Sequence, residues 1–135
     1  MVDSDDPWMM VLSWPARACQ PNSSVHPHTR SAARRAQRAQ AAAAGLLARD
    51  LPADAVLHAE LLFVPPDRRR RDLDNLIASM KGALDGVFDE QGRDDRELRV
   101  ITGYLAEPDR ADCRVELRIR PATAAQLVAL GLAAG

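Results

Sequence analysis

The chain has 135 residues, of which 47% are hydrophobic and 27% are charged. These values fit a single globular domain and exclude a disordered chain. The net charge of −1 does not by itself indicate a nucleic-acid partner, so the distribution of charge matters more than its sum. No apolar run is long enough for a signal sequence or a membrane span. We therefore expect one domain over residues 1–135, with a loose acidic end at residues 1–7.

The two cysteines, Cys19 and Cys113, have neither CxxC nor zinc spacing. Cys113 falls on the apolar side of a strand pattern, which favours a reduced, buried thiol. Together with the lack of a targeting segment, this predicts a soluble protein of the bacterial cytoplasm.

The first half of the chain alternates strand and helix signals. Residues 8–14 form a short apolar run that Pro15 ends, which predicts a buried strand. The proline-containing and polar segment 16–27 predicts a loop. Residues 32–49 are rich in alanine, glutamine and arginine and predict a helix, capped by Thr29 or Ser31.

The second half begins with a strand over residues 56–64, which is apolar on both faces and therefore suits the centre of a sheet. A helical stripe follows, and its members are Leu73, Leu76, Ile77, Met80, Leu84 and Val87. Residues 98–105 and 112–120 predict an antiparallel hairpin, and residues 121–132 a short C-terminal helix. The element order β-α-β-α-β-β indicates an α/β fold, with one mixed sheet packed against two main helices.

Arginine supplies nearly all of the positive charge, because Lys81 is the only lysine among the 18 Lys and Arg residues. A cluster without acidic i, i+4 partners lies on the first predicted helix, and it comprises Arg30, Arg34, Arg35 and Arg38. We expect this cluster to contact phosphates, although a solvated helix face is the alternative.

The most informative stretch follows Pro65 and Pro66. Four arginines, Arg68, Arg69, Arg70 and Arg71, directly precede Asp72 and Asp74. Residues i and i+2 of one helix diverge by about 200°, so these carboxylates converge only if Asp72 is extended and Asp74 lies in the first helical turn. A second acidic pair, Asp94-Asp95, follows in a Gly-containing loop. The alternative is a simple helix cap at Asp72 with a first-turn acid at Asp74.

The run from Pro66 to Leu76 closely resembles the core motif of the RusA family of Holliday-junction resolvases, and the resemblance extends over about residues 60–105. It implies a homodimeric endonuclease, often encoded by phage or prophage, that nicks four-way DNA junctions symmetrically during recombination and repair. Mg²⁺ is the implied cofactor, with Mn²⁺ expected to substitute. By motif matching, Asp72, Asp74 and Asp95 take the essential aspartate positions and would bind the metal. Asn75 and the four preceding arginines adjoin them as DNA-binding residues.

One position departs from the family pattern. The lysine expected four residues after the second aspartate is replaced by Ala78, whereas Lys81 lies seven residues after Asp74, on the same face of a continuous helix. We therefore expect Lys81 to take the catalytic role, with a solvated lysine as the alternative. Two other functions stay open, namely a nuclease acting on flaps or other branched DNA and a catalytically weakened dimer that binds junctions.

Overall fold

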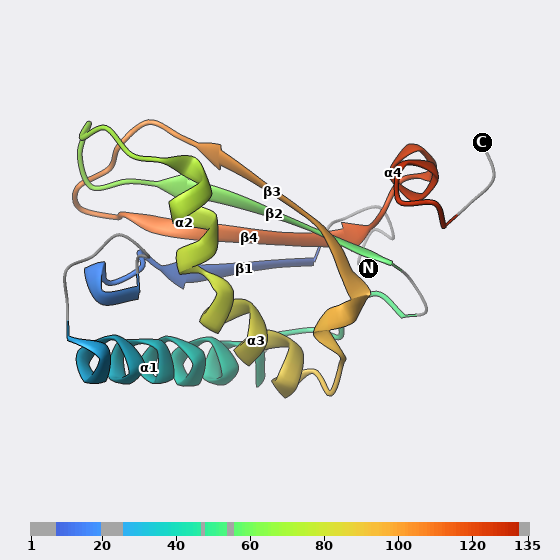
Figure 1. Cartoon of the computed structure of the whole chain (residues 1–135), viewed down its shortest axis with the longest axis horizontal. Helices are drawn as coiled ribbons and strands as arrows, with labels where there is room; N and C mark the ends of the chain where they lie inside the picture. Colours follow the sequence, from blue (N-terminus) through green and yellow to red (C-terminus); the bar gives the residue numbers. More distant parts are fainter. Residues whose placement is uncertain (1–7, 20–25, 47, 54–55, 133–135) are drawn as a thin grey trace.

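The computed structural model describes residues 8–19, 26–46, 48–53 and 56–132, so the expected loose end at residues 1–7 lies outside the described residues. The molecule is a four-stranded mixed sheet with helices packed across one face (Figure 1). The prediction of an α/β fold with one mixed sheet, two main helical segments and a short C-terminal helix is confirmed.

The sheet has the strand order β1-β4-β2-β3. The central strands are β2 (Leu57–Val64) and β4 (Arg114–Pro121), which pair antiparallel. The edges are β1 (Trp8–Ser13), antiparallel to β4, and β3 (Leu98–Leu105), parallel to β2. Because β2 and β3 are parallel, the segment between them crosses from one end of the sheet to the other.

The predicted hairpin between the last two strands is wrong. Strands β3 and β4 do not pair with each other but lie on opposite sides of β2. The physical reason is burial. Val115, Leu117 and Ile119 of β4 are fully buried, whereas β3 keeps several exposed positions, so β4 takes the central place and β3 the edge.

The first helix, α1 (Pro27–Leu46), begins and ends before the predicted boundaries. Neither Thr29 nor Ser31 caps it, because the helix already starts at Pro27. Proline suits the first helical position, since its fixed φ matches the helix and its missing N–H would have no partner there. The ring nitrogen Nδ1 of His26 accepts a hydrogen bond from the backbone N–H of His28 at 3.1 Å and closes the start of the helix.

The second predicted helix is interrupted at Met80, which separates α2 (Leu73–Ser79) from α3 (Lys81–Glu90). The side-chain amide of Gln37, on α1, donates to the carbonyl oxygen of Ser79 at 2.8 Å. The amide thereby satisfies a backbone acceptor at the break. Gly82 and Gly86 lie on the face of α3 that packs closely against α1.

Three short helices complete the fold. The 3₁₀ turns η1 (Arg17–Cys19) and η2 (Asp95–Glu97) precede α1 and β3, and α4 (Ala124–Ala129) carries a capping box formed by Thr123 and Gln126. None of the helices in the described part of the chain is both long enough and apolar enough to cross a membrane.

The core lies between the sheet and the α2–α3 segment. The predicted stripe is buried as expected at Leu76, Met80, Leu84 and Val87 and packs against the inward residues of β1, β2 and β4. Cys113 is only partly buried, because β4 begins one residue later, at Arg114. Cys19 is instead the buried thiol, and its burial raises its pKa.

Candidate functional site

Asp72 and Asp74 lie where the chain changes from extended to helical backbone. Asp72 is the N-cap of α2, with φ −87° and ψ 118°, and its carboxylate accepts the backbone N–H of Asp74 at 2.9 Å. Asp74 lies in the first turn and, like Asp72, is exposed. The backbone geometry required for convergence of the two carboxylates is therefore present, and Asp72 also has the capping role. Asn75 follows, half-buried, in the same turn.

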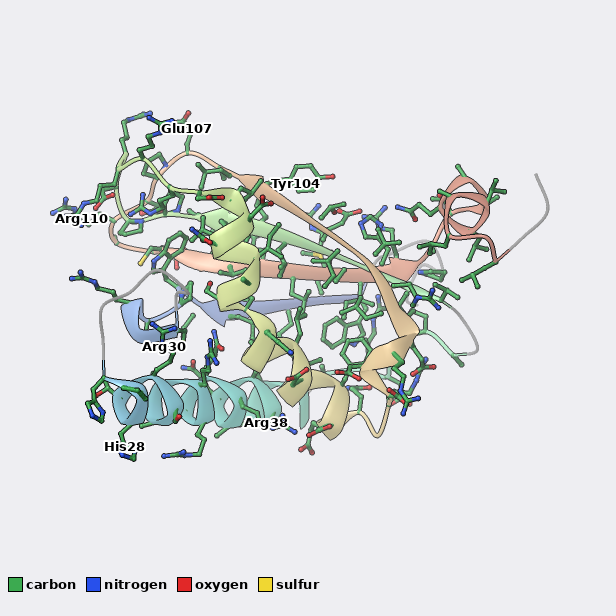
Figure 2. The ribbon with its side chains drawn as sticks, in the orientation of Figure 1. His28, Arg30, Arg38, Tyr104, Glu107 and Arg110 are labelled. Carbon is green, nitrogen blue, oxygen red and sulfur yellow. The ribbon has the colours of Figure 1, made fainter. Side chains whose placement is uncertain are left out.

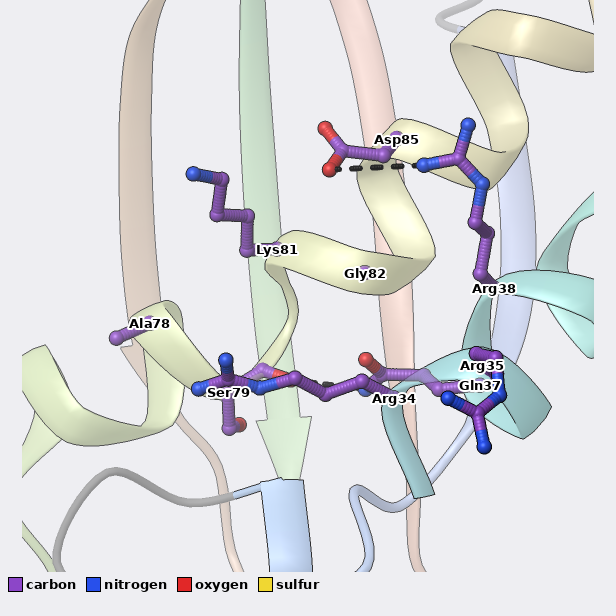
Figure 3. Close-up of a pocket in the computed structure, with 9 residues that line it drawn as sticks. All are labelled: Arg34, Arg35, Gln37, Arg38, Ala78, Ser79, Lys81, Gly82 and Asp85. Atoms are coloured by element: carbon purple, nitrogen blue, oxygen red, sulfur yellow. Dashed lines mark hydrogen bonds and ion pairs between the residues drawn. The ribbon is translucent and has the colours of Figure 1, made fainter. Parts of the chain in front are cut away.

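Asp95 lies at the other end of the α2–α3 segment, in η2. Its carboxyl group lies near that of Asp85 on α3 and, together with burial, helps to raise the pKa of Asp85. Lys81 lies one turn before Asp85, and both extend to the same side of α3 (Figure 3). These three residues line a pocket of about 290 Å³ together with Ile77, Ala78, Leu84, Leu98 and Ile101.

The structure does not bring Asp95 to Asp72 and Asp74. Asp72 follows the carboxyl end of β2, whereas Asp95 precedes the amino end of β3. Because these strands are parallel, the two residues lie at opposite ends of the sheet along the strand direction (Figure 1). Asp74 lies in the first turn of α2, whereas Asp85 lies on α3, beyond the break at Met80. Within the described residues, no group of three or more His, Cys, Asp or Glu side chains is placed to hold a metal ion.

The separation bears directly on the expected Mg²⁺. One chain offers two carboxylates at the start of α2 and two, Asp85 and Asp95, in the pocket lined by α3 and η2, but not the three-carboxylate set that the resemblance implies. Mg²⁺ commonly uses one or two carboxylates and takes its remaining ligands from water and substrate phosphate. Each pair therefore has the right donor type, whereas the complete set does not assemble within one chain.

Two neighbouring acids, Asp67 and Glu107, pair with three of the four arginines of the run. Arg68 pairs with Glu107 at 2.8 Å, on the loop after β3 (Figure 2). Arg71 pairs with Asp67 at 2.7 Å and lies over the ring of Trp14, 5.4 Å from its centroid. Asp67 also makes a longer pair, 3.7 Å, with Arg69. Hydrogen bonds from the backbone N–H of Arg69 and from the Arg71 side chain lower the pKa of Asp67. The lowered pKa favours the ionised carboxylate that these ion pairs require.

The second predicted basic cluster faces a groove. Arg34 and Arg35 line it with exposed side chains, and Arg38 pairs with both Asp85 and Asp89 of α3. Arg30 is half-buried in the first turn of α1 and lies on the side facing η1 (Figure 2). The four arginines predicted as one cluster therefore do not all line the groove. Arg34, Arg35 and Arg38 do, whereas Arg30 is not among its lining residues.

Lys81 does not continue the helix of Asp74, as the sequence argument assumed. The break at Met80 starts a new helix at Lys81, so a rotation counted from Asp74 does not hold across it. The neighbour that the structure gives Lys81 is Asp85. Burial and the charge of Asp95 together raise the pKa of Asp85, and the positive charge of Lys81 opposes them.

Asp85 is the site residue that the sequence analysis missed. The i, i+4 spacing of Lys81 and Asp85 was the available signal, because such residues lie side by side on a helix. The link from Asp85 to Asp95 had no local signal, since it depends on how the loop after α3 returns to the sheet.

The chain matches no family model. It is 36% identical over 104 residues to a protein of Xylella fastidiosa (strain Temecula1 / ATCC 700964) that is described as an uncharacterized protein. The alignment covers 74% of this chain and 67% of that protein.

Proposed function

We propose that this protein is a metal-dependent endodeoxyribonuclease that cuts four-way DNA junctions. The chain belongs to the same protein family as the Xylella fastidiosa protein. The proposal combines the resemblance of the Asp72–Asp74 stretch to RusA resolvases with the chemistry of the residues around it.

One observation carries the proposal. Asp72, Asp74 and Asp95 are exposed and make no ion pair within the described residues, although four arginines directly precede Asp72. Three of those arginines pair with Asp67 and Glu107 instead. None of the three carboxylates is therefore engaged by a cationic side chain, so a divalent cation could bind there without breaking an ion pair.

Because Asp95 lies apart from the other two aspartates, the proposal includes a homodimer. A site that uses all three carboxylates would need Asp72 and Asp74 from one copy and Asp95 from another. A twofold axis would then generate two identical composite sites. Two such sites suit a substrate whose two strands are nicked symmetrically.

The roles of the residues follow from their charges. A divalent cation bound by these carboxylates would neutralise the scissile phosphate and lower the pKa of a bound water. The ammonium group of Lys81, beside Asp85, can hold a phosphate oxygen and stabilise the charge that develops on it. Asp85 lies near Asp95, and burial together with the charge of Asp95 raises the pKa of Asp85.

Cleavage of labelled DNA tests the proposal directly. Purified protein is incubated with a four-way junction, a flap and a linear duplex, each with and without Mg²⁺ or Mn²⁺. We expect paired nicks in the junction that depend on the metal. Cleavage of the flap in preference to the junction would favour the flap nuclease, and metal-independent binding without cleavage would favour the junction-binding dimer.

Asparagine substitutions test the site itself. Asp72→Asn, Asp74→Asn and Asp95→Asn should each abolish cleavage and preserve DNA binding, because the charge is lost while the arginines stay. Asp94→Asn is the matched control. The carboxylate of Asp94 caps η2 through the backbone N–H of Arg96 at 2.9 Å and pairs with the Arg96 side chain, so a milder effect is expected. Cleavage by Asp95→Asn at the wild-type rate would contradict the assignment of Asp95.

A further inference from the structure

A groove of about 550 Å³ runs between α1 and the junction of α2 with α3 (Figure 3). It meets the pocket of Asp95 along a shared wall formed by Ala78, Lys81 and Asp85. The residues that line the groove are Arg34, Arg35, Gln37, Arg38, Ala78, Ser79, Lys81, Gly82 and Asp85.

The positive charge in this groove is available to a ligand. Arg34, Arg35 and Lys81 are exposed, and within the described part of the chain none of them makes an ion pair. Arg68 and Arg71 of the arginine run, by contrast, are already bonded to Glu107 and Asp67. Within the described residues Arg70 is the only member of the run without an ion pair, so the groove offers three unpaired cations and the run offers one.

The walls of the groove are held by close packing. A side chain at Gly82 would place its Cβ 2.7 Å from Oε1 of Gln37 and 3.3 Å from the carbonyl oxygen of Arg34. The bond from Gln37 to the Ser79 carbonyl fixes α1 against the break between α2 and α3. The cationic residues of the two walls therefore stand at a set spacing, which lowers the entropic cost of binding an extended anion.

The composition of the lining selects the class of ligand. No aromatic side chain occurs among the described lining residues, so the groove lacks the stacking surface that unpaired bases use. Arginine and lysine heads instead suit the phosphates of a backbone, which they contact without regard to sequence.

We propose that the groove between α1 and α3 binds the sugar-phosphate backbone of a duplex DNA arm, and that it contributes more to DNA affinity than the Arg68–Arg71 run does. The identity of the polyanion as DNA rests on the proposed nuclease function, and the groove as the binding surface rests on its own charges. A backbone held there passes beside Lys81 and Asp85 and so reaches the wall that the groove shares with the Asp95 pocket.

The test compares two double variants of the full chain that remove the same charge. Arg34→Ala/Arg35→Ala removes two arginines from the groove, and Arg68→Ala/Arg69→Ala removes two from the run. Binding to a fluorescent duplex is measured by anisotropy in EDTA over a range of salt concentrations, so that cleavage plays no part. Thermal melting of each variant reports its fold, and Arg34→Gln/Arg35→Gln replaces the groove variant if alanine lowers its stability.

We expect the groove variant to weaken binding by about tenfold or more and to lower the log–log salt slope by roughly 1.8, or about 0.9 for each phosphate that is no longer bound. The run variant should change both quantities much less. An equal or larger effect in the run variant would overturn the proposal, as would tighter binding to a single strand than to the duplex, or no binding of either. Duplex binding through the groove without cleavage of any substrate would support this inference while contradicting the nuclease function.

Discussion

His58 is a buried histidine whose two ring nitrogens both have partners. Nε2 lies 2.8 Å from the hydroxyl of Thr102 on β3, and Nδ1 lies 3.1 Å from the side-chain amide of Gln126 on α4. The ring therefore joins the edge strand and the C-terminal helix to β2. Burial lowers the pKa of His58 and outweighs the opposing effect of Glu60, while Arg120 lowers it further.

The lowered pKa makes stability depend on pH. The unfolded chain binds a proton at His58 near the usual pKa of about 6.5, whereas the folded chain binds it only at lower pH. The free energy of unfolding should therefore fall as the pH drops below about 6.5, until the folded pKa is passed. His58→Gln should remove this part of the dependence.

The measurement is the melting temperature of both proteins between about pH 7.5 and about pH 5.5, a range that spans the ordinary histidine pKa. The two proteins differ only at residue 58, so the difference between the two curves isolates the contribution of His58. Parallel curves would contradict a buried, neutral His58.

Lys81 carries a second prediction for single residues. Lys81→Ala should slow single-turnover cleavage by about tenfold or more, equivalent to about 1.4 kcal/mol of transition-state stabilisation. DNA binding should weaken only as far as one missing phosphate interaction explains. Lys81→Arg distinguishes a role of the positive charge from a role in proton transfer, because arginine keeps the charge but cannot release a proton. Cleavage by Lys81→Ala at the wild-type rate would leave Lys81 without a catalytic role.

Among the elements, the contact between α1 and α3 depends on the absence of side chains. A Cβ at Gly86 would lie far inside the van der Waals distance of the Arg38 carbonyl oxygen, which belongs to the backbone and cannot easily move. At Gly82 the nearest atom is instead the flexible side-chain oxygen of Gln37. Gly86 therefore allows α3 to pack closely against α1, despite the low helix propensity of glycine.

The two glycines make a matched pair for a stability experiment. Gly86→Ala should lower the free energy of unfolding by about 1–3 kcal/mol, the usual cost of overpacking, despite a gain of about 1 kcal/mol in helix propensity. Gly82→Ala should cost less, because its closest contact is a side-chain atom of Gln37 and not backbone, although a shift of Gln37 would weaken its bond to the Ser79 carbonyl. Denaturant titration measures both changes. Equal stability of Gly86→Ala and the wild type would show that the helices can separate at little cost.

The sequence predicted which residues of an element are buried, but not where a helix breaks or which strands pair. The stripe from Leu73 to Val87 predicted which residues face the core, because burial recurs with the helical period. The break at Met80 could not be predicted from local sequence. The Ser79 carbonyl at the break accepts a hydrogen bond from the side-chain amide of Gln37, which lies 42 positions away in the chain. The hairpin prediction was wrong for a similar reason. Strands β3 and β4 each pair with β2 and not with each other, and only tertiary packing decides between these pairings.

In the candidate site too, the sequence predicted the local features but not the long-range contacts. The local feature, an extended Asp72 followed by Asp74 in the first turn, was predicted and is present. The arginines that precede them were expected to face DNA, but three of the four pair with Asp67 or with Glu107 on the loop after β3. Glu107 lies 39 positions from Arg68, and no local pattern relates the two.

For the whole molecule, the separation of the aspartates gives a test of the composite site. Asp74→Asn and Asp95→Asn are each inactive under the proposed function. If each site combines two copies, a mixed dimer has one site with both substitutions and one with neither, so mixing the two proteins should restore cleavage at roughly half of the sites in those mixed dimers.

If each copy contained a complete site, every site in the mixed dimer would carry one substitution and activity would stay absent. The control mixes Asp72→Asn with Asp74→Asn, which lie in the same turn and should not complement each other. Restored activity in this control would contradict the composite arrangement.

The position of β4 in the sheet also constrains how the chain is made. β1 pairs only with β4 in the described sheet, and Trp8 lies opposite Ile119, more than a hundred residues later. A ribosome therefore releases β1 long before its hydrogen-bonding partner exists, and the strand must wait while β2, β3 and the helices emerge. Closing so long a loop late favours slow completion of the sheet. During synthesis, the apolar residues Trp8, Met10 and Leu12 would then be the surface most in need of a chaperone.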